Sequence, residues 1–450
     1  MSRFCAKADF NCKLGDFNRK LHSSNTAPNL SNRGITDFTP DYKKMNFTYS
    51  RNHDWALWNA GQRVVDTHFV FPLMHLDAND PRNYYFDATD EMIRITQEAG
   101  SKIMYRLGTS IEHSGLRPDQ KHFNSLPPTD YHQYAEALAG IIRHYTQGWA
   151  NGFHYDIEYW EIWNEAENDP TCWKGSYEEF IKFFVIVLKR LKKEFPHLKI
   201  GGPAATGYRE DLILPLLKAC REANIAPDFI SWHGYNNNVH DFVSKVQKMR
   251  DILNNEGLTK CETAITEWHY LLSWEGIQTN MSEKSSKNAF EGRTGLCGID
   301  SAIYNLATLA AWQDTVLDLA FYYGASPKGA WGFQNNFGAY NKVFYSMCIF
   351  GDLLAKTNER IKAESFSETV FLTGGIAADG KSAMLMVADY RGTESELRIK
   401  IDGIEKAEVS AQLLDIENDR TETDVIFENG ELILPKKDNG SSAFLIEFKF

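Results

Sequence analysis

Short runs of β-forming residues alternate with amphipathic stretches of helical period from about residue 15 to about residue 350. The strand candidates occupy 47–51, 103–107, 157–163, 199–202, 229–233, 263–267 and 317–323, with a weaker one near 16–23. Repeated strand–helix units of this kind predict an α/β architecture with a parallel sheet. Eight strands interleaved with helices is the number that a closed (β/α)8 TIM barrel requires, although an open doubly wound sheet is an alternative. The sequence contains no Gly-rich dinucleotide or phosphate fingerprint, and this favours the barrel.

The helical period disappears after about residue 357, where short alternating runs separated by turn signals take over. Three of the turns contain Asp379-Gly380, Asn429-Gly430 and Asn439-Gly440, which are pairs that favour tight hairpins. We therefore expect a (β/α)8 barrel over 1–350 and a β-sandwich over 351–450, with the first 15 or so residues as candidates to pack on the sandwich. The 450 residues leave room for both, because single hydrophobic cores rarely grow beyond roughly 250 to 300 residues.

Composition excludes several classes of partner and cofactor. The formal net charge of -12 argues against nucleic acid, and the absence of a long apolar run argues against a membrane span. The seven cysteines are scattered without a CxxC pair, so we expect free thiols and neither a disulfide framework nor a zinc site. The first residues lack the apolar core of a secretory signal, and we expect a cytoplasmic protein. A periplasmic or secreted location stays open if a signal was removed.

Two glutamates end strand candidates that lie far apart in the sequence. Glu165 closes the fourth candidate, and Glu267 closes the seventh. Catalytic residues of a parallel barrel lie at the carboxyl ends of its strands, so both are expected on one rim. A pair of opposed carboxylates can cleave a glycosidic bond, with one as proton donor and the other as nucleophile. A single glutamate at a strand end is more often solvated or ion-paired, so the argument depends on the pair.

The other strand ends carry groups that suit a sugar, whose C–H faces stack on aromatic rings and whose hydroxyls need hydrogen-bond partners. These groups are Arg51, His53, Asp54, Arg106, Asn164, His233, Tyr235, Trp268 and Trp331. Some of them also have an ordinary structural interpretation. His53 and His233 could be hydrogen-bonded structural histidines, and Arg51 could be a simple ion-pair partner.

Four motifs at the strand ends, Trp163–Glu165, Lys199–Pro203, Phe229–Tyr235 and Ile265–Trp268, resemble those of clan A glycosidases. More narrowly, they are similar to glycoside hydrolase family 39, which includes β-xylosidases and α-L-iduronidases. The resemblance covers roughly residues 15 to 350, and a sandwich after the barrel also fits the family. It implies that Glu165 is the acid/base and Glu267 the nucleophile of a retaining mechanism.

The resemblance also implies roles in substrate binding. Asn164 matches an asparagine that bonds the 2-hydroxyl of the sugar, and Arg51 looks like the arginine of the clan beside the nucleophile. His233 and Tyr235 match a His-x-Tyr pair in which the tyrosine contacts the nucleophile and the histidine lines the sugar site. Trp331 looks like an aromatic wall of the glycone pocket.

The expected function is therefore retaining cleavage of a terminal glycosyl residue from an oligosaccharide or glycoside, without cofactor or metal. A neutral pyranose is expected, xylose first, with the two carboxyls about 5 to 5.5 Å apart. The alternatives are a galactoside, an arabinoside or a uronide. Lys328 or Arg106 could bind the carboxylate of the uronide. A catalytically silent carbohydrate-binding barrel is a further alternative. The sequence leaves the oligomeric state open.

Overall fold

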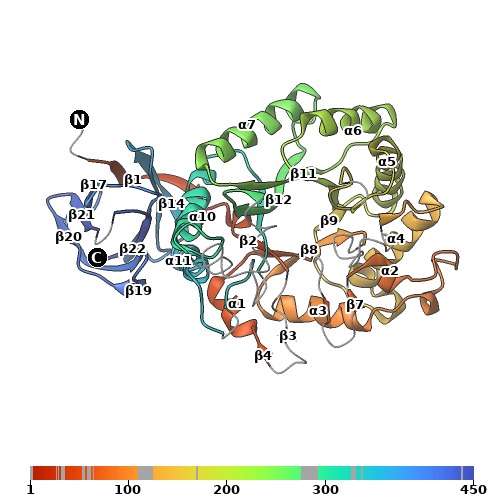
Figure 1. The fold of residues 1–450 in the computed structure, drawn as a ribbon, viewed down its shortest axis with the longest axis horizontal. Coiled ribbons are helices and arrows are strands. Elements are labelled where there is room, and N and C mark those ends of the chain that lie inside the picture. The colour runs from red at the N-terminus through yellow and green to blue at the C-terminus, as the bar shows by residue number, and fades with distance from the viewer. Residues whose placement is uncertain are drawn as a thin grey trace.

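The computed structural model describes residues 4–450 apart from 27, 29, 32–35, 53–55, 58–61, 64, 110–124, 169–170, 275–291, 326–330, 336–337 and 437–438. Eight parallel strands close into a barrel (Figure 1). Around the barrel they are β2 (Ser23–Asn25), β5 (Tyr49–Asn52), β8 (Lys102–Leu107), β9 (Tyr159–Ile162), β10 (Lys199–Ala205), β11 (Phe229–Asn236), β12 (Glu262–Tyr270) and β13 (Leu319–Tyr322). The expected closed (β/α)8 barrel is thus confirmed.

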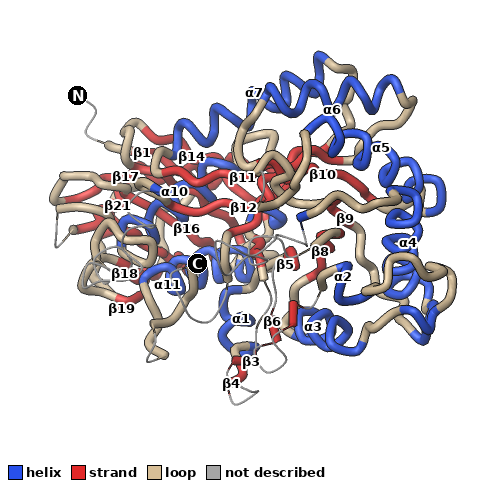
Figure 2. The backbone as a smooth tube through the Cα atoms, turned by 45° about the vertical axis from the view of Figure 1, so that its right-hand side comes forward, coloured by secondary structure: helices blue, strands red, loops and turns tan. Residues whose placement is uncertain are grey.

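Helices cover the outside of the barrel strands (Figure 2). They are α1 (Thr39–Met45), α2 (Thr67–Val70), α3 (Asp87–Glu98), α4 (Tyr131–Gln147), α5 (Tyr177–Glu194), α6 (Glu210–Glu222), α7 (Val239–Asn255), α10 (Ile299–Trp312) and α11 (Lys342–Lys356). The two short antiparallel ribbons β3 (Leu30–Ser31) with β4 (Thr36–Asp37) and β6 (Ala56–Leu57) with β7 (Gln62–Arg63) lie outside the barrel sheet. None of the described helices is long and apolar enough to cross a bilayer.

Helix α5 shows how the sequence sets these elements. It begins with a capping box, in which the Ser176 hydroxyl accepts a hydrogen bond from the Glu179 backbone N–H and the Glu179 carboxylate accepts one from that of Ser176. Phe180, Phe184 and Leu188 then recur at helical spacing and are fully buried. The apolar stripe turns this face toward the barrel, and the helix ends before Pro196.

The barrel interior is filled in layers. Near the amino ends of the strands lies an apolar layer made by Tyr49, Met104, Tyr159, Phe229, Ala264, Leu319 and Phe321. Two residues further along three of these strands, the inward positions become polar and buried, at Arg51, Glu161 and Ser231. The interior therefore changes from apolar to ionic toward the carboxyl ends of the strands.

The weak strand candidate at 16–23 was wrong. The barrel strand β2 covers only Ser23–Asn25, a short 3-10 helix at Arg19–Leu21 precedes it, and Asp16 ends β1 (Ala6–Asp16), a strand of a different sheet. The sequence Ser-Ser-Asn has no apolar residue, so it shows no alternation by which a strand could be recognised. Its neighbours β13 and β5 hold it in the barrel by parallel pairing.

The C-terminal strands and β1 form one ten-stranded sheet. Its order is β19 (Asp419–Glu422), β18 (Glu408–Leu414), β22 (Ser442–Lys449), β16 (Ser382–Asp389), β15 (Val370–Ile376), β14 (Glu359–Ser365), β1, β17 (Glu396–Asp402), β21 (Glu431–Pro435) and β20 (Ile426–Glu428). The expected sandwich is a single sheet that curls around one apolar cluster, to which strands from both of its ends contribute. The β1–β17 pair is parallel. In Figure 1 the red β1 lies among the blue strands.

The sheet packs against the barrel through its other face. Met384, Met386 and Leu445 on that face belong to the same core as the barrel helices, and α10 contacts β15 and β16. The junction between α11 and β14 falls at 357–358, a few residues after the expected boundary at 350/351. The two parts therefore share a continuous core.

Arg391, which follows β16, makes a second connection. Its φ of 60° is left-handed, an uncommon conformation for a residue other than glycine. Its guanidinium donates to Asp300 Oδ2 on α10 (3.1 Å) and to the Tyr270 hydroxyl at the end of β12 (2.9 Å). The adjacent Tyr390 hydroxyl donates to the Asn237 carbonyl after β11 (2.9 Å). The sheet thus braces the carboxyl ends of β11 and β12.

Candidate active site

Glu267 lies on β12 where this strand contains an extra residue. Ala264 belongs to the barrel interior and Ile265 to the outer core. Strict alternation would therefore turn Glu267 outward, on the same side as Ile265. The register toward β11 shifts between Ile265 and Glu267, and the register toward β13 shifts between Ile265 and Trp268. This bulge turns the carboxylate of Glu267 into the barrel and leaves Trp268 in the outer core.

Glu165 follows β9 in a segment with unusual backbone angles. Trp163 (φ 70°) and Glu165 (φ 46°) are both left-handed, which side chains other than glycine seldom adopt. The Trp163 N–H donates to the Leu107 carbonyl (2.7 Å), and the Glu165 N–H donates to the Ala204 carbonyl (2.9 Å). These bonds hold the segment between β8 and β10, and strained backbone of this kind concentrates at functional sites.

His233 on β11 connects the two glutamates. Its Nδ1 lies 2.6 Å from Glu165 Oε1 and 3.4 Å from Glu267 Oε2. A carboxylate oxygen of Glu165 and one of Glu267 lie within 4.8 Å of each other. Burial lowers the pKa of His233, so the ring is neutral at pH 7 and carries one proton. The two glutamates thus face one another across a short gap that a sugar carbon can enter.

Arg51 on β5 lies beneath the glutamates and is fully buried. Its Nη1 donates to Glu267 Oε1 and to Asn25 Oδ1, both at 2.9 Å, and its Nη2 donates to Asn164 Oδ1 at 2.7 Å. Its Nε donates to Glu161 Oε2 at 2.6 Å. One guanidinium therefore orients the nucleophile candidate, the asparagine beside Glu165, and two further side chains.

Tyr235 makes the other strong contact with Glu267, because its hydroxyl donates to Oε2 at 2.6 Å. Burial raises the pKa of Tyr235, and the neighbouring Glu267 adds to this, so the hydroxyl stays protonated. Burial also raises the pKa of Glu267, whereas His233, Arg51 and the bond from Tyr235 oppose the rise. Arg51 and Tyr235 therefore stabilise the ionised form of a carboxylate that burial alone would protonate.

Three aromatic rings contact the ring of Tyr235. The ring of Trp331 lies 5.8 Å from that of Tyr235, and the ring of Trp274 lies 5.0 Å from it. Tyr323 contacts both Tyr235 and Trp331. Trp274 is 50% exposed, which leaves much of its ring open to solvent. Such rings offer apolar faces on which the C–H groups of a sugar can stack.

The other sequence-based candidates either take no part in the hydrogen bonds and ion pairs described for the two glutamates or fall outside the described residues. His53 and Lys328 fall outside the described residues. Arg106 is buried, with its Nη1 bonded to the Thr109 carbonyl (2.8 Å). Trp268 packs edge-on against Trp312, outside the barrel sheet.

Sequence reasoning missed Asn25, Glu161 and Trp274 as parts of the site. Asn25 lies on the strand that was misplaced, and Trp274 follows β12 in a region with no recognised periodicity. Glu161 had a readable signal. It is a charged residue two positions after Tyr159 in a strand, where alternation places both side chains on the inner face.

Glu165, His233 and Glu267 could each offer one ligand atom to a cation within their shared gap. The positive guanidinium of Arg51 already lies 2.9 Å from Glu267, and Tyr235 occupies the other carboxylate oxygen. A second positive charge at this point would be repelled by the first. The chemistry of these groups therefore suits proton transfer and nucleophilic attack better than metal binding.

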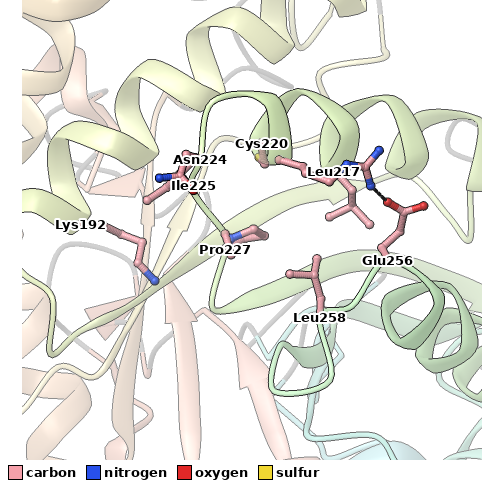
Figure 3. A pocket seen from close by; sticks show the side chains of 10 residues that line it. Lys192, Leu217, Cys220, Asn224, Ile225, Pro227, Glu256 and Leu258 are labelled. Carbon is pink, nitrogen blue, oxygen red and sulfur yellow. Dashed lines mark hydrogen bonds and ion pairs between the residues drawn. The ribbon is translucent and has the colours of Figure 1, made fainter.

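A separate pocket lies at the opposite end of the barrel, among the segments that lead into β11 and β12 (Figure 3). It has a volume of about 440 Å³ and a largely apolar wall that includes Leu217 and Ile225. The charges at its edge are already paired, Lys192 with Asp228 (2.5 Å) and Arg221 with Glu256. The pocket has no contact with the two facing glutamates.

Comparison with known proteins agrees with the geometry. A β-xylosidase from Geobacillus stearothermophilus is 30% identical over 118 residues, and a β-xylosidase from Caldicellulosiruptor saccharolyticus is 30% identical over 115 residues. Each match covers 25% of this chain and only 22% of the relative.

Among solved structures, a glucosidase from Croceicoccus marinus superimposes over the whole of both chains with a TM-score of 0.80 at 20% identity. A monomeric β-xylosidase from Caulobacter crescentus CB15 superimposes over 99% of both chains with a TM-score of 0.69 at 14% identity. At these identities the likeness shows the fold, including the sheet beside the barrel.

The family model described as glycosyl hydrolases family 39 matches residues 24–268, which is more than half of the chain. The match extends from the first barrel strand to the seventh and includes both facing glutamates. The chain therefore belongs to glycosyl hydrolase family 39.

Proposed function

We propose that this protein is a retaining glycoside hydrolase that removes a terminal glycosyl residue, with Glu165 as acid/base and Glu267 as nucleophile. The observation that carries the proposal is the pair of facing carboxylates at the carboxyl ends of β9 and β12, with an oxygen of one within 4.8 Å of an oxygen of the other. Retaining enzymes place these groups about 5 to 5.5 Å apart, whereas inverting enzymes need about 6.5 to 9.5 Å for an intervening water. The short gap supports retention.

In the first step, a Glu267 oxygen attacks the anomeric carbon while the bond to the leaving oxygen breaks. Glu165 gives its proton to that oxygen, which departs as a neutral alcohol. Arg51 and Tyr235 hold the attacking carboxylate by its two oxygens, and they orient it before the substrate arrives. Glu267 then carries the glycosyl group as an ester.

In the second step, water attacks the same carbon and the ester bond to Glu267 breaks. The Glu165 carboxylate takes the proton of this water and regains its initial state. His233 lies at hydrogen-bond distance from Glu165 Oε1, and Asn168 donates to its Oε2 at 2.8 Å. These neighbours hold the acid/base in one position through both of its protonation states.

For the glycone, we propose a neutral pyranose with xylose first. Besides the two glutamates and Arg51, which is paired with Glu161 and Glu267, the described site is lined by aromatic and neutral polar groups, and the Arg106 guanidinium is bonded to a backbone carbonyl. The relatives support this choice by their names, since two are β-xylosidases and one structural neighbour is a glucosidase. A uronide would require a cation beside the sugar ring, and a galactoside or an arabinoside remains an alternative for the test.

A panel of 4-nitrophenyl glycosides that differ only in the sugar tests both parts of the proposal. We expect the fastest turnover with the β-xyloside, and the first-formed product should retain the β configuration by NMR. The Glu267→Gln variant, which conserves shape and removes the nucleophile, should be inactive on every member. Faster turnover of a uronide contradicts the glycone. Binding of sugars without turnover by the folded wild type identifies a silent carbohydrate-binding barrel instead.

A further inference from the structure

Glu161 is the buried carboxylate that the proposed mechanism leaves without a task. It lies on β9 with no exposed surface, one layer below the facing glutamates. Its Oε2 accepts from Arg51 Nε at 2.6 Å, and its Oε1 has no hydrogen-bond partner among the described residues. Burying a carboxylate costs free energy that a single ion pair seldom repays. Such a group is therefore better explained by what it does for its neighbour than by stability.

The geometry of Arg51 shows what Glu161 can fix. Glu161 accepts a hydrogen bond from Nε of the guanidinium, while Nη1 donates to Glu267 and Nη2 donates to Asn164. Because the guanidinium is planar, a bond at Nε sets the rotation of the whole group. With that edge anchored, the other two nitrogens can point only toward the reacting face of the barrel.

Glu161 also changes the charge that Glu267 experiences. A single buried cation lies between two buried carboxylates, at 2.6 Å from Glu161 and 2.9 Å from Glu267. In the low dielectric of this interior, a charge shared between two partners neutralises each of them incompletely. Without Glu161, the whole positive charge of Arg51 would act on Glu267. The ionised carboxylate of Glu267 would then be stabilised further and would be a weaker nucleophile.

We propose that Glu161 is a positioning residue of the active site, which fixes the Arg51 guanidinium and shares its charge so that Glu267 remains a reactive nucleophile. This inference rests on the proposed function, because it assigns Glu267 that role. Glu161 itself touches no substrate and acts through Arg51.

The effect has to be separated from the other groups that face Glu267. These are Arg51 on β5, Glu165 after β9, and His233 and Tyr235 on β11. None of them is replaced by a substitution at Glu161, and loss of that charge only lowers the pKa of His233 further, so the ring stays neutral. A shift in the titration of Glu267 can therefore be assigned to the charge at position 161.

The test is the pH dependence of kcat/KM in Glu161→Gln, measured with any glycoside that the wild type hydrolyses. Glutamine can still accept from Arg51 Nε but carries no charge. We expect the acid limb, which reports ionisation of the nucleophile, to move down by about one pH unit. The kcat should fall while KM changes by less than about two-fold, because a nucleophile that is held more tightly slows the chemical step. An unmoved or raised acid limb in a folded variant overturns the proposal.

Three variants serve as controls. Glu161→Asp keeps the charge, so its acid limb should stay within about 0.3 pH units of the wild type. A limb that moves in this variant as far as in Glu161→Gln would remove the charge argument. Glu262→Gln deletes a carboxylate at the far end of β12, and Asp389→Asn breaks the buried ion pair with Lys436 in the sheet domain. Both should affect stability and leave the limb in place.

The proposal can fail separately from the proposed function. If the wild type hydrolyses glycosides and the Glu161→Gln limb does not move, only the role of Glu161 is refuted. If no glycoside is turned over, a ¹³C spectrum of carboxyl-labelled glutamates, assigned with Glu267→Gln, follows the protonation of Glu267 directly. Its titration should again move to lower pH in Glu161→Gln, and an unchanged titration refutes the coupling.

Discussion

Replacing Tyr235 by phenylalanine removes one oxygen atom from the site and leaves its packing in place. The hydroxyl donates to Glu267 Oε2 at 2.6 Å, whereas the ring contacts Trp331 and Trp274. Phenylalanine keeps these ring contacts. Tyr235→Phe is therefore a specific test of how the hydrogen bond controls Glu267.

The size of the effect follows from the bond that is lost. A hydrogen bond to a charged group contributes about 1.5 to 3 kcal/mol, and 1.36 kcal/mol corresponds to one pH unit. The pKa of Glu267 should therefore rise by about one to two units, and about one is expected because Arg51 and His233 remain. The sign follows because the bond favours the ionised form. The acid limb of kcat/KM should move to higher pH, in the direction opposite to that of Glu161→Gln.

The assay is kcat/KM against pH with the best nitrophenyl glycoside, beside thermal unfolding to confirm the fold. Tyr322→Phe is the matched control, since Tyr322 is also buried but bonds to His269 Nε2 at 2.5 Å and not to Glu267. Its acid limb should coincide with that of the wild type. A limb that stays in place or moves down in folded Tyr235→Phe would refute the account of Glu267 given above.

Three further outcomes follow from the structure. Glu165→Ala should hydrolyse substrates with poor leaving groups much more slowly and should accumulate the glycosyl ester. Added azide should restore turnover and give a β-glycosyl azide, which NMR of the product detects, whereas an azide of inverted configuration would mean that the two glutamates are exchanged. Trp274→Ala should raise KM several-fold, since stacking on a ring contributes about 0.5 to 1.5 kcal/mol, and an unchanged KM would exclude it from the substrate site. Burial lowers the pKa of His22 and of His269 from 6.5 to about 4. The free energy of unfolding should therefore fall as the pH falls from 6.5 toward 4, by roughly 3 kcal/mol for each histidine, because the unfolded chain binds protons that the folded chain does not. Urea unfolding of the variant with both histidines replaced by glutamine should show a flatter pH dependence of this free energy.

Most of the barrel could be predicted because its strands carry the signal that sequence reasoning uses. Seven of the strand candidates overlap β5 and β8 to β13, since their apolar runs are bounded by turns and followed by helical periods. The first strand could not be found, because Ser23–Asn25 is short and polar and is a strand only through its neighbours. The exposed edge strand β19 likewise has no apolar face by which alternation could reveal it.

The two glutamates could be placed on one rim from sequence, but the way in which they point inward could not. Simple alternation along β12 turns Glu267 away from the interior, and the bulge before it depends on the registers of both neighbouring strands. The left-handed angles at Trp163 and Glu165 likewise depend on hydrogen bonds to other strands. Geometry that arises from neighbours leaves no local trace in the sequence.

The place of β1 has a consequence for the order in which this protein can be assembled. β1 lies between β14 and β17, so it alone connects a group of six strands with a group of three. During synthesis its partners emerge only after the whole barrel has left the ribosome, and Ala6, Ala8 and Phe10 stay uncovered until then. The sheet is completed only when β14 and β17, which follow the barrel in the sequence, pair with β1, which precedes it. Loss of β1 would divide this sheet in two. A tag added near residue 6, or proteolysis there, would therefore disturb strands that lie near the C-terminus in the sequence.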